Sequence, residues 1–411
     1  MMGKPKIRFK GYNEDWEQRK FSELVMIERG GSPRPIDKYI TKAENGLNWV
    51  KIGDAPEQSN YITKTSEKII PEGLSKTREV HPGDLILSNS MSFGRPYIMA
   101  IDGCIHDGWL AIRDTEKRFD LKFLCTLLGT DSMLNQYKAM AAGSTVNNLN
   151  KELVGSTIVS FPKMDEQTKI GEYFTNLDHL ITLHQHKCDE MKKLKKYMLQ
   201  KMFPKNGKKV PEIRFDGFTN DWEQRKLGEV VEFFNGDRSS RYPNDSDMVP
   251  EGIPFINAGD LVSGRVKLDT ANKITEEKYN ELSGAKIQRG DIIYCLRGTL
   301  GKNAFVDNFD AGTVASSLVD IRPKKIVGKY LFQVLNSDIE YRQRTVNDEG
   351  AAQPNLSAKN LSLFDIPMPS EFEQEKIALY FDTLDHLITL HQHKCDELQN
   401  FKKYMLQNMF V

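Results

Sequence analysis

Six of the eight histidines in this sequence lie in two similar stretches, and in each stretch a histidine is followed four residues later by a cysteine. The two pairs are His184 with Cys188 and His391 with Cys395. Residues four apart share a helix face, so the two pairs together have the ligand types of a Cys2His2 zinc site. The alternative is a set of polar layers that fix the register of a coiled coil. We favour the polar layers and expect no metal, because a closed zinc site needs all its ligands at one level.

Three pairs of loops carry side chains suited to DNA contact. Arginine pairs with guanine, asparagine and glutamine pair with adenine, and serine, threonine and lysine contact bases or phosphates. The alternative for each pair is an ordinary surface loop with solvated side chains, and we prefer that alternative for the third pair. The candidate residues are Arg34, Lys38, Arg238 and Arg241 in the first pair, Asn89, Ser90, Ser92, Arg95, Arg297, Thr299 and Lys302 in the second, and Thr145, Asn147 and Gln353 in the third.

The motifs of several enzyme classes are missing from the sequence. It contains no GxxxxGK(S/T) phosphate loop, no GxGxxG turn and no HExxH metal motif, and GTLGK at 298–302 is too short for a phosphate loop. An Asn/Asp-Pro-Pro-aromatic motif, which would hold the amine in an amino-methyltransferase, is also missing. Pro250-Glu251 followed by Glu276-Glu277-Lys278 loosely fits a nuclease pattern, but the first half has no counterpart. We therefore predict a non-catalytic chain.

These candidates belong to a chain that repeats itself. Residues 5–25 and 211–231 share DWEQRK at an offset of 206, and residues 178–203 and 385–410 are identical at 21 of 26 positions at an offset of 207. The middles differ, although landmarks such as HPGDLIL and QRGDIIY stay in step. This pattern predicts a duplicated domain with a shared framework at its ends and a differing function in its middle. Two such domains can sit about a pseudo-two-fold axis.

The tail of each half predicts a long helix. At about 1.5 Å per residue, a helix over 165–203 would be roughly 60 Å long. Apolar or small residues recur in steps of four and three, as in a heptad seam. We expect the two seams to pair in an antiparallel coiled coil through Ile170, Phe174, Leu177, Ile181 and Cys188, and through Ile377, Phe381, Leu384, Ile388 and Cys395.

Each middle predicts a globular domain of mixed α/β structure. Short apolar runs between turn residues predict strands at 84–87, 98–101, 291–295 and 314–320, and short helices at 119–128 and 328–335. The predicted fold class is therefore α+β, with two similar mixed α/β domains joined by two long helices.

The composition is typical of a soluble globular protein, with 39% hydrophobic and 28% charged residues among 411. No apolar run is long enough to span a membrane and no leader opens the chain, so we expect a cytoplasmic protein without a membrane partner. The 57 basic and 57 acidic residues count against a polycation that coats nucleic acid, but permit basic residues gathered on one face. The clearest charge asymmetry lies at 178–209, with nine lysines against three acids.

The chain resembles the specificity subunits of type I restriction–modification systems over essentially its whole length. The matching features are the duplicated PxIRFxG…WEQRK opening, GSPRP…NWVKIGD with GDRSSRYPN…IPFINAGDL, GDLILSNSMSFGRP with GDIIYCLRGTLGKNA, and the two EQxKI…LDHLITLHQHK segments. No single motif is highly specific. The order of the motifs, which occurs in both halves of the chain, is specific.

The resemblance implies four segments. Residues 1–163 and 209–370 would be target-recognition domains that each read one half of a bipartite, asymmetric DNA site, and residues 164–208 and 371–411 would be conserved spacer helices that set the distance between the halves. It also implies as partners double-stranded DNA, two methyltransferase (M) subunits and, through them, restriction/translocase (R) subunits. S-adenosylmethionine, ATP and magnesium would belong to those partners, and this chain would hold no cofactor.

Two alternatives remain open. A coiled-coil adaptor would bind protein partners without reading DNA, and would present an apolar patch where a DNA reader concentrates lysine and arginine. An enzyme with an unrecognised site would need a cleft in which titratable groups with perturbed pKa values converge.

Overall fold

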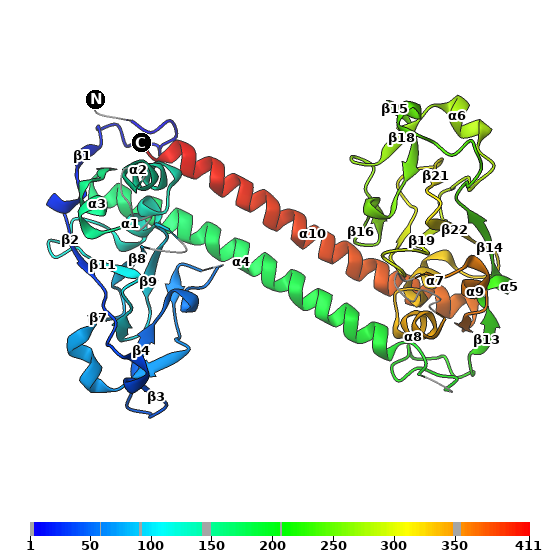
Figure 1. Cartoon of the computed structure of the whole chain (residues 1–411), viewed down its shortest axis with the longest axis horizontal. Coiled ribbons are helices and arrows are strands. Elements are labelled where there is room, and N and C mark those ends of the chain that lie inside the picture. Colours follow the sequence, from blue (N-terminus) through cyan, green and yellow to red (C-terminus); the bar gives the residue numbers. More distant parts are fainter. Residues whose placement is uncertain (1–3, 58, 90–92, 142–148, 206–207, 348–354) are drawn as a thin grey trace. The chain divides into compact units, whose positions relative to one another are not determined.

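The computed structural model describes residues 4–57, 59–89, 93–141, 149–205, 208–347 and 355–411 (Figure 1). The chain divides into two compact units. Unit 1 comprises Met1–His186 and His391–Val411, and unit 2 comprises Lys187–Leu390. Each unit therefore combines one globular part with one half of each long helix.

The globular part of unit 1 is built on two five-stranded sheets, with its short helices gathered at one end (Figure 1). One sheet has the order β2 (Met26–Arg29), β11 (Trp109–Arg113), β8 (Leu85–Ser88), β9 (Pro96–Met99) and β5 (Tyr61–Ile62). The other has the order β3 (Ile40–Thr41), β6 (Glu67–Ile69), β4 (Leu47–Val50), β10 (Gly103–Ile105) and β7 (Arg78–Val80). A separate ladder joins β1 (Glu17–Lys20) to β12 (Ile158–Phe161), and the helices are α1 (Leu121–Leu128), α2 (Asp131–Ala141) and α3 (Lys151–Ser156).

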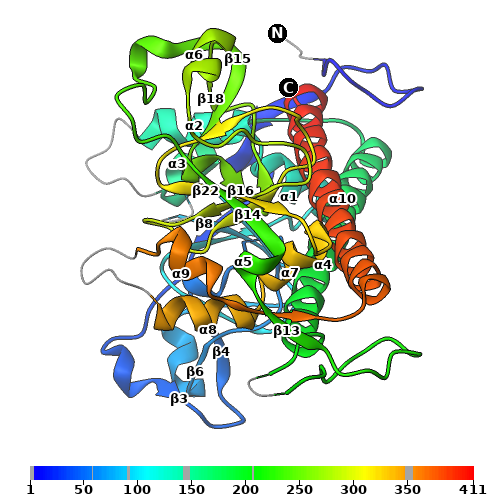
Figure 2. The same cartoon turned by 90° about the vertical axis from the view of Figure 1, so that its right-hand side faces the viewer.

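Unit 2 has a similar plan, but its sheets have fewer strands and are divided differently (Figure 2). Its main sheet has the order β14 (Val231–Asn235), β22 (Leu318–Pro323), β19 (Ile292–Cys295) and β20 (Asn303–Phe305). Smaller sheets join β18 (Asn272–Ile274), β15 (Met248–Ile256) and β21 (Thr313–Val314), then β16 (Leu261–Val262) with β17 (Arg265–Val266), and β13 (Glu223–Lys226) with β23 (Asp365–Met368). The short helices are α5 (Leu227–Val230), α6 (Glu276–Glu281), α7 (Gly328–Val334), α8 (Asp338–Val346) and α9 (Ala358–Ser362).

The predicted strands and helices of the middles are present, with one difference. The run 314–320, expected as one strand, is divided between β21 and β22. The amide of Leu318 donates to the carbonyl of Ala315 at 2.9 Å, and this turn carries the chain from one sheet to the other. An apolar run shows that a segment is buried but does not show where it bends.

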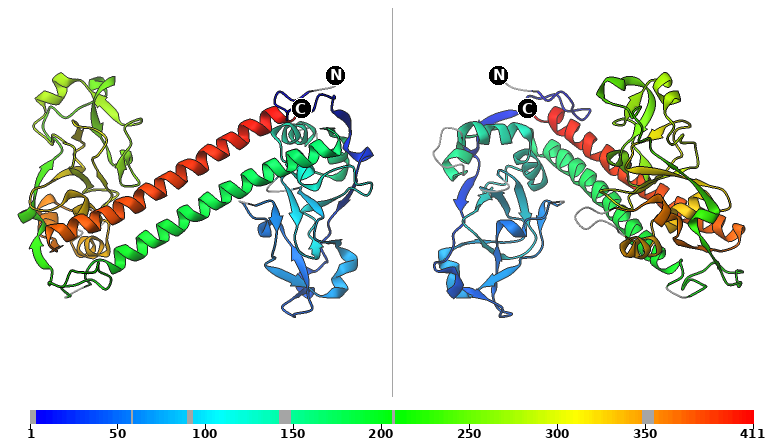
Figure 3. Two further views of the ribbon diagram at one scale, coloured as in Figure 1. Left: turned by 180° about the vertical axis from the view of Figure 1, so that it is seen from behind. Right: turned by 45° about the vertical axis from the view of Figure 1, so that its right-hand side comes forward.

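The two long helices are α4 (Met164–Lys201) and α10 (Glu371–Met409), and they lie side by side (Figure 3). In unit 1, Asp178 of α4 pairs with Lys402 of α10, and His184 Nδ1 lies 3.0 Å from His391 Nδ1. Residue numbers rise along one helix as they fall along the other, so the predicted antiparallel pairing is confirmed within unit 1.

The same direction holds in unit 2. Cys188 Sγ lies 3.8 Å from the carbonyl of Ile388, and Lys195 Nζ lies 2.7 Å from Asp385. The seam therefore contains thiol contacts and ion pairs in both units, and a pair of imidazoles in unit 1, in addition to apolar contacts.

The last turn of α10 completes the core of unit 1. The ring of Phe410 packs on Trp16, Phe123 and Phe174, with centroids 6.1, 5.7 and 5.8 Å away. Trp16 is 1% exposed, so it packs within this core. The core of unit 1 therefore contains a side chain from the second repeat.

The end of α4 does the same in unit 2. Phe203 packs on Trp222, Tyr330 and Phe381, with centroids 6.5, 5.9 and 6.2 Å away. These four residues are the counterparts, at offsets of 206 or 207, of the aromatic cluster in unit 1. Each globular core is thus finished by the helix end of the other repeat.

The opening segment of each half is tied to the start of its own long helix. Arg8 Nε lies 2.7 Å from Glu166, and Arg214 Nε lies 2.7 Å from Glu373, with both carboxylates almost fully buried. These acids sit in the first turn, where the helix dipole favours negative charge. The Glu-Gln pairs at which the helices begin are therefore part of the framework.

Among the helices in the described ranges, none is long and apolar enough to cross a membrane.

Candidate nucleic-acid interface

In unit 1, loops that are far apart in the sequence meet around Asp107, just before β11. The Ser32 hydroxyl donates to Asp107 Oδ1 at 2.9 Å, and Arg34 Nη2 lies 3.8 Å from Asp107 Oδ2. The side-chain amide of Asn89 donates to the Asp107 carbonyl at 2.9 Å. The amide of Leu149 then donates to the Asn89 carbonyl at 3.1 Å. Ser32, Arg34, Asn89 and Leu149 are thus brought together with Asp107 in one cluster.

Unit 2 contains the same cluster around Ser316 and Ser317, just before β22. Arg238 Nη2 donates to the Ser316 carbonyl at 3.2 Å, and the amide of Leu296 donates to the Ser317 carbonyl at 2.9 Å. The amide of Leu356 donates in turn to the Leu296 carbonyl at 3.0 Å. We call these two assemblies the loop clusters of units 1 and 2.

The candidate side chains of unit 1 lie in different environments. The side chain of Arg34 is 78% exposed, and Lys38 is also exposed. Asn89 is 3% exposed, so its amide holds the cluster together from within. Arg95 reaches the carbonyl of Glu57 at 2.6 Å and lies over the ring of Tyr97. Ser90, Ser92, Thr145 and Asn147 lie outside the described residues.

The candidate side chains of unit 2 also lie in different environments. Arg238, Arg297 and Thr299 are exposed, and Arg297 Nε donates to Asn355 Oδ1 at 3.2 Å. Arg241 donates to the carbonyl of Glu281 at 2.9 Å, and Lys302 donates to the carbonyl of Ala258 at 2.7 Å. Gln353 lies outside the described residues.

Sequence reasoning missed the residues at the centre of each loop cluster. Asp107 stands one residue before a glycine and Ser316 two residues before a strand, and neither lies in a segment that the two halves share. Asp107 also contacts His106 Nε2 at 2.9 Å. Its contacts with Ser32 and Asn89 link two loops, and its carboxylate partly offsets the charge of Arg34. Strand pairing brings these residues to the loops: β11 pairs with its neighbours in unit 1, and β22 pairs with its own neighbours in unit 2.

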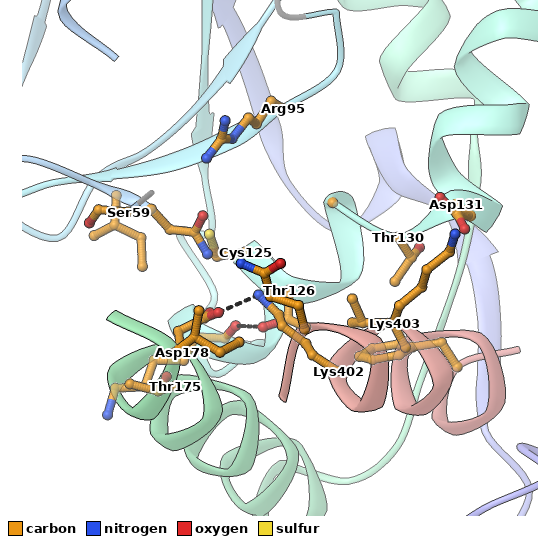
Figure 4. A pocket seen from close by; sticks show the side chains of 18 of the residues that line it. Ser59, Arg95, Cys125, Thr126, Thr130, Asp131, Thr175, Asp178, Lys402 and Lys403 are labelled. Atoms are coloured by element: carbon orange, nitrogen blue, oxygen red, sulfur yellow. Dashed lines mark hydrogen bonds and ion pairs between the residues drawn. The ribbon is translucent and has the colours of Figure 1, made fainter. Parts of the chain in front are cut away.

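A cavity of about 1030 Å³ lies in unit 1 between its short helices and the two long ones. Figure 4 shows Lys402 reaching Asp178 across it, Arg95 on the opposite wall, and Lys403 extending toward Asp131. The counterpart in unit 2 is about 550 Å³ and contains the equivalent pair, Lys195 and Asp385. The framework therefore forms the same cavity twice.

The outer surface of the long helices carries exposed apolar and aromatic side chains at matching positions of the two repeats. Leu183 and Leu390 are exposed, and Tyr197 and Tyr404 are 50% and 55% exposed. The exposed Leu and Tyr residues therefore occupy equivalent positions in the two repeats.

The residues predicted to pair the helices are mostly buried. Six of them pack inside the two large cores, where α4 and α10 meet the globular parts: Ile170, Phe174 and Leu177 in unit 1, and Ile377, Phe381 and Leu384 in unit 2. Cys188 and Cys395 are buried at the seam, and Ile181 and Ile388 are half-buried beside them. In the described part of the chain, no group of three or more His, Cys, Asp or Glu side chains is arranged to hold a metal ion.

The nuclease-like residues do not form one group. Glu251 contacts Lys273, whereas Lys278 contacts Asp247. The most perturbed acid in unit 2 is Asp320, where burial raises the pKa to about 8. It is fully buried inside the sheet, away from the loop cluster.

A family model described as "Type I restriction modification DNA specificity domain" matches residues 13–193 and 219–400. The type I restriction enzyme MjaVIII specificity subunit of Methanocaldococcus jannaschii is 22% identical over 405 residues, covering 96% of this chain and 91% of that protein. The type I restriction enzyme EcoBI specificity subunit of Escherichia coli is 22% identical over 383 residues, covering 89% and 78%.

Solved structures share the fold. The S subunit of a type I restriction-modification system from M. genitalium matches with a TM-score of 0.61 at 16% identity, covering 100% of this chain and 99% of that one. A chain from a structure on complex assembly and conformational transition of the type I R-M system gives 0.56 at 18% identity, covering 96% and 97%. The predicted architecture of two mixed α/β domains with two long helices packed together is confirmed.

Proposed function

The chain belongs to the family of type I restriction modification DNA specificity domains and is the non-catalytic specificity subunit of such a system, and from this premise we propose how its parts divide the work. Each globular part reads one half of a bipartite, asymmetric DNA site. The long helices fix the spacing between the halves and dock two methyltransferase subunits. In this scheme residues 1–163 and 209–370 are the target-recognition domains, and residues 164–208 and 371–411 are the spacer helices.

The observation that carries the proposal is that equivalent backbone positions meet in both units but carry different side chains. The same backbone positions hold Asn89 in one unit and Leu296 in the other, each accepting from a leucine amide. A shared scaffold with unlike loops suits two different half-sites, since base edges are read by side chains and phosphates fix position. Asp107 would accept a hydrogen bond from a cytosine amine, and Arg238 and Arg297 would donate to guanine or phosphate.

The helix surface supports two docking sites for one kind of partner. Leu183, Tyr197 and their counterparts are exposed yet identical in the two repeats. A complex with two copies of a methyltransferase needs two equivalent surfaces, whereas two half-sites need two different ones. S-adenosylmethionine, ATP and magnesium then belong to the methyltransferase and restriction subunits, in a complex that works in the cytoplasm.

The decisive test replaces residues 26–160 with the corresponding segment of another family member. The hybrid is expressed with its methyltransferase subunits, and methylated positions are mapped across a genome by single-molecule sequencing. We expect one half-site to change while the other half-site and the spacer stay the same. An unsplit palindromic motif for the parent, or a change in both half-sites of the hybrid, would overturn the proposal.

A second test separates DNA reading from the adaptor alternative. Arg297→Ala should weaken methylation of the cognate site by roughly 10- to 100-fold, as expected for loss of one base contact. Arg34→Ala is the matched change in the other unit and should affect the other half-site. Binding of the assembled methyltransferase to DNA should also weaken steeply as salt rises. An adaptor would show neither effect.

A further inference from the structure

A chain of three polar residues, of which Tyr294 and Glu340 are buried, lies directly behind the loop Leu296–Lys302 of unit 2. The Tyr294 hydroxyl donates to Glu340, and Arg344 Nε donates to the same carboxylate oxygen at 2.7 Å. Tyr294 is on β19, immediately before the loop, and the other two residues are one turn apart on α8. Glu340 is almost completely buried, so its charge depends on these two donors.

The guanidinium of Arg344 is in contact with the loop backbone. A Cβ atom on Gly301 would stand 2.5 Å from Arg344 Nε and 2.8 Å from its Cζ. Gly301 also has a φ of +85°, which other residues rarely adopt. The positive φ favours glycine at position 301, and the absence of a side chain there lets the guanidinium of Arg344 lie against the loop backbone.

Unit 1 supports its equivalent loop without charge. Gly94 has a φ of +76°, and a Cβ atom there would stand 2.7 Å from the ring of Tyr137, the counterpart of Arg344. Leu87 and Met133 take the places of Tyr294 and Glu340, and both belong to the hydrophobic core. The Tyr137 hydroxyl is buried without a hydrogen-bond partner among the described residues. In both units a side chain from a helix lies against the glycine of the loop. That side chain is a charged arginine in unit 2 and an uncharged tyrosine in unit 1.

We propose that Tyr294, Glu340 and Arg344 form a positioning network that sets the conformation of the loop Leu296–Lys302 and thereby the bases that unit 2 accepts. This inference rests on the proposed function. Arg297 and Thr299 project from the loop, and Arg344 supports it from behind while remaining 21% exposed. A guanidinium fixed by a buried carboxylate is a rigid support, because its planar donors hold one orientation.

The network makes the specificity of unit 2 sensitive to changes that touch no DNA. Glu340→Gln removes the charge that orients Arg344 but preserves the volume of the side chain, and Tyr294→Phe removes one donor to that carboxylate. Each variant is tested in the full chain, assembled with its methyltransferase subunits. Methylation rates are measured on the cognate duplex and on duplexes with single base changes in either half-site.

We expect Glu340→Gln to reduce discrimination against wrong bases in the half-site of unit 2 by about tenfold or more, and to leave the half-site of unit 1 unchanged. The control is Arg322→Lys on β22, which weakens a buried ion pair with Asp291, the residue that precedes β19. If Arg322→Lys and Glu340→Gln have the same stability and lose the same amount of discrimination, the network has only a general structural role and the inference is overturned. Unchanged discrimination in a folded Glu340→Gln variant would overturn it as well.

A second variant guards against loss of folding. The triple change Tyr294→Leu, Glu340→Met and Arg344→Tyr installs the support used by unit 1 and removes the buried charges, which is often neutral or stabilising. We expect this variant to assemble and to show an altered half-site for unit 2. Retention of the parental half-site would count against the inference. The segment exchange at 26–160 tests the proposed function separately, so success there with failure here would reject the network alone.

Discussion

One arginine in each unit contacts two carboxylates near the ends of the central strands. One carboxylate is equivalent in the two units, whereas the other comes from a different strand. In unit 1, Arg113 contacts Glu28 on β2 at 2.7 Å and Asp84 at 2.9 Å. In unit 2, Arg322 contacts Asp291 at 2.8 Å and Asp320 on β22 at 3.6 Å. Glu28 faces Ala111 across the strands of unit 1, and Phe234 faces Asp320 in unit 2. The carboxylate has therefore changed places within one cross-strand pair.

The exchange leaves Asp320 poorly compensated. It is fully buried, and neither carboxylate oxygen accepts a hydrogen bond from a described residue. Burial raises the pKa of Asp320 to about 8, and the charge of Asp291 contributes to the rise. Since the same carboxyl titrates near pH ~3.9 when unfolded, the folded state holds a proton that the unfolded state releases. Its contribution to stability is complete below pH ~4 and is lost as the pH rises to about 8.

Asp320→Asn should therefore stabilise the protein above neutral pH. We expect a gain of at least about 1 kcal/mol at pH 8, because one pKa unit corresponds to about 1.4 kcal/mol. Urea unfolding at several values between pH 5 and pH 8 should show a flatter profile than that of the parent. Asp320→Ala, which installs the residue found in unit 1, is the companion variant. A parent more stable than both variants at pH 8 would mean that the ion pair with Arg322 outweighs the cost of burial.

The buried pair Arg8–Glu166 should make the opposite contribution. Glu166→Gln leaves the buried guanidinium without its charged partner and should cost about 2–4 kcal/mol. Chemical denaturation measures the loss, and the double variant Arg8→Met/Glu166→Met is the control, since it removes both charges and should recover part of it. A single variant with parental stability would contradict the role given to this pair.

At the residue scale the sequence predicted little of the loop clusters beyond their locations. It identified segments that do come together, including those around Arg34, Asn89 and Leu149. It did not reveal that Asn89 is buried or that Asp107 lies at the centre. Those facts depend on strand pairing between residues far apart in the chain, which a local pattern does not encode.

Among the elements, the long helices were the most predictable, because their heptad pattern is long and occurs twice. Their extents in the structure differ from the prediction by one or two residues. The pattern did not reveal that Ile170, Phe174 and Leu177 pack within a globular core as well as along the helix pair. A heptad position indicates that a side chain is buried, but it does not identify the residues that pack against it.

Each phenylalanine at a helix end should stabilise the globular core that it completes. Phe410→Ala should cost about 3 kcal/mol, as is usual for removal of a buried phenyl ring. Hydrogen exchange should increase within residues 1–186, because the lost contacts are with Trp16, Phe123 and Phe174. Phe203→Ala is the matched variant and should increase exchange within residues 208–390. Equal effects of either variant on both units would contradict this division.

For the whole molecule, the proposed spacer role makes a geometric prediction. Seven residues inserted into both α4 and α10, at matching points of the seam, preserve the heptad pattern and lengthen each helix by about 10.5 Å. The spacer of the methylated motif should then grow by about three base pairs, since each pair adds about 3.4 Å. Both half-sites should stay unchanged. Insertion into α4 alone breaks the register with α10, and it should impair assembly instead of lengthening the spacer.

The way the chain is shared between the two units has a consequence for its biosynthesis. Unit 2 is one continuous stretch, Lys187–Leu390, whereas unit 1 joins Met1–His186 to His391–Val411. Domains generally fold in the order in which they leave the ribosome. Here residues 1–186, which are translated first, need residues 391–411 before their core can close, whereas unit 2 is complete once Leu390 has been translated. A stop codon just before Phe410 would therefore damage unit 1 more than unit 2.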